Sequence, residues 1–319
     1  MDSTGVRIVD LSKLRSTSFS ERSAAIHDIG RACQAMGFFQ VVNHGVGADI
    51  LQGALDAATA FFNLPMEDKS GLSSDDIRQP VRYSTVSELD DGEVKIRRHV
   101  LKQYSRPLET WIQKWPSKPI DYREKMAMFS AQMWRLVSEL VEAVTESLGL
   151  GRHYLTSRME RGFEMMGLNY YPPCHQDDDG GAICFAPHTD YTLLTALLAT
   201  QQGLEYLDRE SGSWHPAPSG SFTLVVHVGN YLEVLSNGRY RAALHRVVSH
   251  RGAAPRVSIA SLSSFAMEES VEVAEELVEE TQPPMYRAST LSEFIDFLSA
   301  GNRGADFMEQ SLKIARDKL

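Results

Sequence analysis

The sequence is poor in cysteine. Only three of its 319 residues are cysteines, Cys33, Cys174 and Cys184, and no two of them form a CxxC pair. A low, odd cysteine count argues against a disulfide framework and favours a reducing compartment. We therefore expect a cytoplasmic protein in which each cysteine serves as a small hydrophobic residue.

Positive charge and long hydrophobic runs are also scarce. There are 32 Lys and Arg against 42 Asp and Glu, which gives a net charge of -10. An acidic surface repels phosphate backbones, so a nucleic acid is not an expected partner. Apolar runs such as residues 193–199 are far shorter than the about 20 residues of a membrane span, and the N-terminus lacks the apolar segment of a signal peptide. We expect a monomer that binds a small molecule and no membrane.

The first part of the chain predicts mainly helices. Apolar residues repeat at helical spacing over residues 18–36 and 49–62, with a short strand at 38–42 between them. Residues 66–118 are rich in charge and turn formers, which predicts irregular structure with a turn at Asp90-Asp91-Gly92. A long amphipathic helix is predicted over 121–148. We place a boundary at residue 118, between an N-terminal helical or mixed domain (1–118) and a second domain (119–319).

The second part of the chain predicts a β core. Short runs rich in β-branched and aromatic residues alternate with turn signals, at residues 165–171, 192–198, 204–207, 222–228, 244–249 and 257–265. Several short strands at this spacing are typical of a sandwich or barrel. Helical patterns return at 291–298 and 305–315. The expected fold class is mainly β with flanking helices.

Two histidines and an aspartate form a candidate metal site. His188 and Asp190 have i, i+2 spacing, so on a strand both point to one face. His245 follows 55 residues later in another predicted strand. Two histidines and one carboxylate are the ligands of non-haem Fe(II) oxygenases, and they leave open positions for a cosubstrate and O2. The alternative is a pair of polar strand-end residues and a hydrogen-bonded core histidine.

A candidate carboxylate site lies next to it in the sequence. Arg256 and Ser258 again have i, i+2 spacing, and a guanidinium with a hydroxyl on one face binds a carboxylate well. The alternative is an arginine paired with a structural Asp or Glu. Asn169 and Tyr171 share a strand face ahead of Pro172-Pro173, and their polar ends could reach a carboxylate and a keto oxygen. The alternative there is a pair of residues at the rim of a barrel.

Taken together, these motifs resemble those of the plant 2-oxoglutarate- and Fe(II)-dependent dioxygenases, within the isopenicillin-N-synthase-like superfamily. The matching segments are GFFQVVNHG at 37–45, NYYPPC at 169–174, HTD at 188–190, LEVLSNGRYR at 232–241, HRV at 245–247 and RVS at 256–258. The resemblance covers nearly the whole chain. It implies a distorted double-stranded β-helix, or jelly roll, packed by N-terminal and C-terminal helices.

The resemblance also implies the roles of the candidate residues. His188, Asp190 and His245 would hold Fe(II). Arg256 and Ser258, with help from Tyr171, would hold the far carboxylate of 2-oxoglutarate (2OG), and Asn169 would lie near its metal-bound end. The implied cofactors are Fe(II), 2OG as cosubstrate, O2, and ascorbate as reductant.

Two segments depart from the family pattern. The Asp177–Asp179 run could form a second metal site, but it lacks EF-hand spacing and we interpret it as a solvated loop. His227 and Asn230 stand where the family often has Asn and Asp. His227 could support the site from behind, and we interpret it instead as a core histidine.

The substrate is inferred from weaker features. Expected pocket residues are Tyr83, Arg98, Tyr104, Leu262, Ser264 and Phe265. This mixture suits a flat, mostly apolar small molecule. Segments 82–115 and 258–286 resemble the flavone-synthase-I and downy-mildew-resistance clade. That implies hydroxylation or desaturation of a flavonoid, from flavanone to flavone or hydroxyflavanone, or alternatively of salicylate, another phenolic acid, an indole or a terpenoid hormone.

Two rival functions remain open at this point. One is an Fe(II) oxidase that uses no 2OG, because such relatives keep both the triad and the Arg-x-Ser pair. The other is a jelly roll that binds a metal or a small ligand without turnover.

Overall fold

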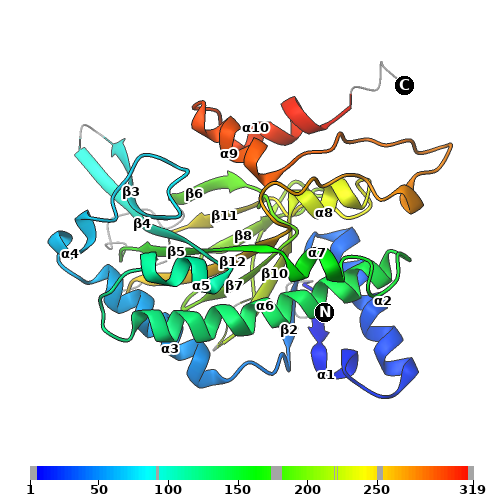
Figure 1. The fold of residues 1–319 in the computed structure, drawn as a ribbon, viewed down its shortest axis with the longest axis horizontal. Coiled ribbons are helices and arrows are strands. Elements are labelled where there is room, and N and C mark those ends of the chain that lie inside the picture. Colours follow the sequence, from blue (N-terminus) through cyan, green and yellow to red (C-terminus); the bar gives the residue numbers. More distant parts are fainter. Residues whose placement is uncertain are drawn as a thin grey trace.

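Two facing β-sheets form the centre of the structure (Figure 1), a computed structural model that describes residues 6–90, 93–173, 182–218, 220, 222–249 and 254–314. In order across the large sheet, the strands are β1 (Ile8–Asp10), β2 (Phe38–Val42), β10 (Leu224–Val228), β7 (Leu194–Ala199), β12 (Arg256–Ser264), β5 (Phe163–Tyr171), β4 (Glu93–Arg106) and β3 (Val81–Asp90). In order across the small sheet, they are β6 (Ile183–His188), β11 (His245–Val248), β8 (Leu204–Leu207) and β9 (Trp214–Pro216). The predicted jelly roll with flanking helices is confirmed.

Helices cover the outer face of the large sheet. The long α6 (Tyr122–Ser147) and α3 (Ala48–Phe62) pack against it, while α9 (Leu291–Ser299) and α10 (Gly304–Phe307) lie on the opposite side of the molecule (Figure 1). The remaining helices are α1 (Leu11–Leu14), α2 (Phe19–Ala35), α4 (Met66–Ser70), α5 (Leu108–Trp111), η1 (Ile112–Lys114), α7 (Thr156–Glu160), α8 (Asn230–Leu235), η2 (Glu275–Leu277) and η3 (Met308–Leu312). Within the described ranges, no helix is long and apolar enough to cross a membrane.

Strand alternation separates two kinds of interior. On β12, Val257 and Ile259 join the core under α3 and α6, whereas Arg256 and Ser258 face the small sheet. The same alternation runs through β5, where Leu168 lies on the helix side and Asn169 on the other. Because successive side chains of a strand point to opposite faces, one face can be a dry core while the other carries polar chemistry.

The predicted irregular structure over residues 66–118 is wrong. Val81–Asp90 and Glu93–Arg106 form a long antiparallel hairpin that extends the large sheet beyond β5. Their strand pattern is hidden in the sequence because charged residues such as Arg82 and Lys102 occupy inward-facing positions, where hydrophobic residues are the usual signal. Of the turn predicted at Asp90-Asp91-Gly92, Asp90 is the last residue of β3, and Asp91 and Gly92 lie outside the described residues.

The other predicted elements agree with the structure to within a few residues, except at the C-terminus. There the single helix predicted over 305–315 is a short α10 followed by the π-helical turn η3. The division at residue 118 stays a prediction, since strands from both sides of it share one hydrogen-bonded sheet.

A carboxylic acid is buried where β5 meets α6. Glu164 is fully buried and accepts hydrogen bonds at Oε2 from the hydroxyls of Ser130 (2.5 Å) and Ser105 (2.7 Å). Burial raises the pKa of Glu164 to about 7, although the two hydroxyls oppose this rise. The folded protein therefore prefers the protonated form of this side chain.

We predict that Glu164→Gln changes how stability depends on pH. Because the folded pKa is raised, Glu164 contributes most below its unfolded pKa of 4.5, and this contribution falls as the pH rises to about 7. An amide does not titrate, so the unfolding free energy of Glu164→Gln relative to wild type should rise by about 3 kcal/mol across that window. Urea denaturation at several pH values measures this. Exposed Glu109→Gln is the control, and parallel profiles for Glu164→Gln and wild type would contradict the prediction.

Candidate active site

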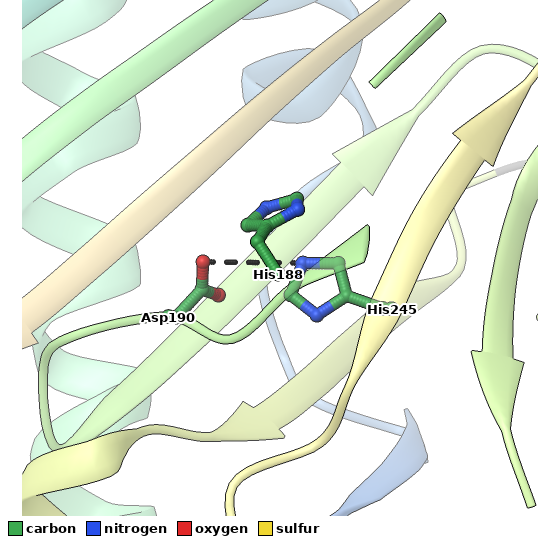
Figure 2. A group of neighbouring side chains, drawn as sticks. All are labelled: His188, Asp190 and His245. Carbon is green, nitrogen blue, oxygen red and sulfur yellow. Dashed lines mark ion pairs between the residues drawn. The ribbon is translucent and has the colours of Figure 1, made fainter. Parts of the chain in front are cut away.

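Three side chains converge between the sheets. Figure 2 shows His188 at the end of β6, Asp190 in the loop that follows, and His245 at the start of β11, pointing toward one another. One ligand atom from each lies within 4.8 Å of the others, and Nε2 of His245 is 3.9 Å from Oδ1 of Asp190. His188 and His245 are directly paired across the small sheet, so strand register brings together residues that are far apart in the sequence.

Backbone carbonyls fix the orientation of both imidazoles. Nδ1 of His188 donates to the carbonyl of Ala186 (2.8 Å), and Nδ1 of His245 donates to the carbonyl of Ala243 (2.9 Å). These bonds place the ring proton on Nδ1 and leave each Nε2 as an unprotonated ligand, the arrangement common in metal-binding histidines.

The electrostatics of the three residues suit a cation. Burial lowers the pKa of His188, and it lowers that of His245 to about 3, so both imidazoles are neutral at neutral pH. Burial alone would raise the pKa of Asp190, but His245, His227 and His188 around it hold that pKa well below its usual value. The site therefore presents two neutral imidazoles and one carboxylate anion, a donor set that fits Fe(II).

His227 is more than a core histidine, so that interpretation was wrong. It is 2% exposed, yet its Nδ1 donates to Oδ2 of Asp190 (3.3 Å), and its Nε2 accepts from the hydroxyl of Tyr206 (2.5 Å). The chain Tyr206–His227–Asp190 holds the carboxylate oxygen that does not face His245. The inward position of His227 in strand β10 indicates a buried side chain, but the sequence does not indicate its partner.

The loop that carries Asp190 is anchored to the start of α8. The backbone N–H of Asn230 donates to the carbonyl of Asp190 (2.8 Å), and that of Gly229 donates to Leu193 (2.9 Å). A Cβ at Gly229 would lie 1.9 Å from the carbonyl oxygen of Thr192, so only glycine permits this close approach. The departure from the family pattern at Asn230 thus leaves a backbone contact intact.

Arg256 is a buried cation without a carboxylate partner. It is 1% exposed, its Nε donates to the carbonyl of Gln201 (3.1 Å), and its Nη1 donates to Oγ of Ser258 (3.2 Å). In the described part of the chain no Asp or Glu forms an ion pair with it, which argues against the alternative of a structural ion pair. A buried guanidinium of this kind calls for an anionic ligand.

Tyr171 and Asn169 lie beside this arginine. They pair in register with Arg256 and Ser258 respectively, and the Arg256 guanidinium lies 5.1 Å from the centre of the Tyr171 ring. Arg98, from β4, donates to Oδ1 of Asn169 (3.0 Å) and stacks on the ring of Phe185 at 3.4 Å. All four predicted cosubstrate residues therefore share one wall.

One cavity of about 260 Å³ connects the triad to this wall. It contains His188, Asp190, His245, Arg256, Ser258, Tyr171 and Asn169 in its lining. Its remaining surface is mostly apolar and includes Val100, Phe163, Met165, Leu291, Phe294, Ile295 and Leu298. The last four belong to α9. Sequence reasoning did not find the contribution of α9, because a short amphipathic helix carries no sign of what its apolar face covers.

The structure places three of the six predicted pocket residues in this cavity: Arg98, Tyr104 and Leu262. Tyr83 is on the opposite face of β3, where its hydroxyl is 2.8 Å from Nδ1 of His99. Ser264 is buried at the end of β12, outside the lining, and Phe265 lies beyond it under the guanidinium of Arg158, 3.6 Å from the ring centre. Those three expectations were wrong because strand alternation or the end of the strand turns the side chains away.

The Asp177–Asp179 loop and Cys174 lie outside the described residues. Within the described residues, the triad is the one group of His, Cys, Asp or Glu side chains spaced to hold a metal ion.

This arrangement defines a class, the non-haem oxygenases with a metal site of two histidines and one carboxylate. Two family profiles match the sequence: the 2OG-Fe(II) oxygenase superfamily over residues 162–264, and the N-terminal region of non-haem dioxygenases in morphine synthesis over residues 6–118. The chain belongs to the 2OG-Fe(II) oxygenase superfamily. It is a plant-type dioxygenase that uses Fe(II) and 2OG.

Two rice (Oryza sativa subsp. japonica) proteins are similar over nearly the full length. Flavanone 3-dioxygenase 3 is 41% identical, with 95% of this chain and 91% of that protein covered. The chloroplastic 2-oxoglutarate-dependent dioxygenase 21 is 43% identical, with 96% and 90% covered. Among solved structures, JOX2 in complex with 2OG, Fe and JA superposes with a TM-score of 0.83 at 25% identity, covering 97% of this chain and 89% of that one.

We predict that His227→Ala weakens metal binding. Without the imidazole, Asp190 loses a hydrogen-bond donor that orients it, and loss of such a supporting contact typically costs roughly 10- to 100-fold in affinity. Calorimetric titration with Mn(II) in place of Fe(II) measures the change. Exposed His153→Ala should bind as wild type does, and equal affinities for His227→Ala and wild type would show that Asp190 does not depend on His227.

Proposed function

We propose that the enzyme hydroxylates or desaturates a small, mostly apolar plant metabolite of the flavonoid class, converting a flavanone to a flavone or a hydroxyflavanone. The observation that carries this proposal is the apolar cavity that opens directly onto the triad. Its size and its aromatic and aliphatic lining suit a flat ring compound. The flavanone dioxygenase among the similar proteins supports the same class of substrate.

In this proposal His188, Asp190 and His245 hold Fe(II), which supplies activation of O2 coupled to oxidative decarboxylation of 2OG. The protein contributes position and exclusion of water. Arg256 and Ser258 fix the far carboxylate of 2OG, with Tyr171 against the guanidinium and Asn169 toward the metal-bound end. The apolar face of α9 shields the cavity, so a reactive species formed there meets the substrate rather than water.

Other substrates remain as second candidates. Salicylate, other phenolic acids, indoles and terpenoid hormones fit a cavity of this kind. The rival without 2OG and the rival without turnover are set aside by the family assignment. Ascorbate as reductant, a monomeric state and a cytoplasmic location stay predictions, and one similar protein carries the description chloroplastic.

A direct test combines Fe(II), ascorbate and 2OG with a panel of flavanones, flavones, phenolic acids and indoles. Succinate release and product mass are measured together. We expect a flavanone to give one product that has gained one oxygen or lost two hydrogens. A product from a phenolic acid or an indole, with none from any flavanone, would replace the proposed substrate class.

We predict that Asp190→Ala abolishes Fe(II)-dependent succinate release without unfolding the chain. The substitution removes the only carboxylate of the triad but leaves both imidazoles neutral. Activity and thermal unfolding are measured on the same preparation. A folded, fully active variant would overturn the assignment of the metal site.

We also predict that Arg256→Ala raises the KM for 2OG by roughly 10- to 100-fold, because hydrogen bonds to a charged group are lost. The Fe(II) concentration that gives half-maximal activity should change little. Arg161→Ala, which removes an exposed guanidinium, serves as the matched control. If the KM for 2OG and the Fe(II) concentration for half-maximal activity rose together, the assignment of Arg256 to the carboxylate of 2OG would be contradicted.

A further inference from the structure

Two cations in the cavity wall take no part in the sites described above. Arg82 on β3 and Lys102 on β4 are directly paired across the hairpin, and both line the cavity. Two like charges directly opposite each other destabilise an antiparallel pair of strands. We therefore expect an anionic or hydrogen-bond-accepting group near the two cations, either from the protein or from a ligand.

The protein offers little compensation. In the described residues, neither the Lys102 ammonium nor the Arg82 guanidinium has a hydrogen-bond or ion-pair partner among the side chains or carbonyls. Asp75 and Asp76 act on Arg82 electrostatically, but both are exposed and neither lines the cavity. The anion of Asp190 acts on Lys102, and that carboxylate is committed to the metal site.

The surroundings of Lys102 disfavour its charge. Burial lowers the pKa of Lys102 to about 8, and the charges of Arg82 and Arg98 add to this, while Asp190 opposes it. An anion placed at the ammonium would reverse this effect. Perturbed groups that line a cavity in this way are typical of ligand-binding sites.

Strand register places small residues beside this pair. Next to Lys102 on β5 is Gly167, and next to Gly167 on β12 is Ala260. Both small residues line the same cavity as the two cations, and the side chain of Leu262 is the nearest to Gly167. The strand of Lys102 is two strands away from that of Arg256, which is about 10 Å at normal strand spacing. Arg82 and Lys102 are thus separate from Arg256 and Ser258, the residues proposed to bind 2OG.

We propose that Arg82 and Lys102 bind an oxyanion of the substrate, either a carboxylate or an ionised phenol, on the far side of β5 from Arg256. The inference rests on the proposed function and narrows it to a ring compound with an acidic group. The apolar lining next to the pair, at Tyr104, Met165 and Leu262, contacts the ring. An acidic hydroxyl on a flavonoid and the carboxylate of a phenolic acid both meet this requirement.

Two matched pairs of compounds test the proposal by binding. The first pair is 4-hydroxycinnamate and its methyl ester, and the second is a flavanone with a free 7-hydroxyl and its 7-O-methyl ether. Calorimetry without oxygen, on the full chain with Mn(II) and 2OG, gives each affinity. We expect at least one acidic compound to bind roughly 10-fold or more tightly than its neutral twin, as hydrogen bonds to a charged donor imply.

Substitutions then locate the effect. Lys102→Met keeps the length of the side chain and removes its charge, and it should erase the preference for the acidic compound, as should Arg82→Met. Lys102→Arg should restore it. Lys118→Met, at an exposed lysine paired with Asp68, should retain it. Thermal unfolding confirms that each variant is folded.

The outcomes separate this proposal from the proposed function. A preference within the first pair alone identifies a carboxylate, and one within the second pair alone identifies an ionised phenol. Equal affinity within both pairs, no binding of either acid, or a preference that survives in Lys102→Met would overturn the oxyanion site. Succinate release and product mass, measured with wild-type enzyme on the flavanone panel, test the proposed function by themselves, whatever the binding results.

Discussion

Buried charge is the constraint on which this structure depends. Asp190 and Arg256 lie in the same space between two sheets. Within the described chain, Asp190 pairs with histidines but with no Lys or Arg, and Arg256 pairs with no Asp or Glu. Asp190 accepts a hydrogen bond from His227, which in turn accepts one from Tyr206, and Arg256 donates to a carbonyl and a serine. An isolated buried charge is costly, so both positions suit a ligand of opposite charge, and we propose a metal cation at Asp190 and a carboxylate at Arg256.

The register of the sheets fixes where these charged side chains lie relative to one another. His188 and His245 face each other across the small sheet, and Arg256, Tyr171, Ser258 and Asn169 form two adjacent pairs on the large one. Because all of these positions are on strands, their separations are set by backbone hydrogen bonds. The hairpin of β3 and β4 widens the same surface and adds Arg82 and Lys102 at its edge. The triad on the small sheet and these positions on the large sheet thus line one cavity.

The sequence predicted the parts of the site that obey short-range rules. Spacing of two residues on a strand was enough to find the pairs at 188 and 190 and at 256 and 258. Tyr83 was assigned to the cavity because the β3–β4 hairpin was not predicted, and without the strand its face could not be known. The contact of His227 with Asp190 joins strand β10 to the loop after β6, so no local pattern reports it. Inward-facing charges such as Lys102 concealed the hairpin, because a hydrophobic residue is the usual signal at such a position.

The central claim is that one ligand, 2OG, bridges Arg256 and Ser258 at one end and the metal held by the triad at the other. Calorimetric titration of 2OG into the protein, with and without Mn(II) and in the absence of oxygen, tests this most directly. The account predicts one 2OG per chain and much tighter binding when the metal is present, since the metal supplies half of the contacts. Equal affinity with and without the metal, or no binding in its presence, would contradict it.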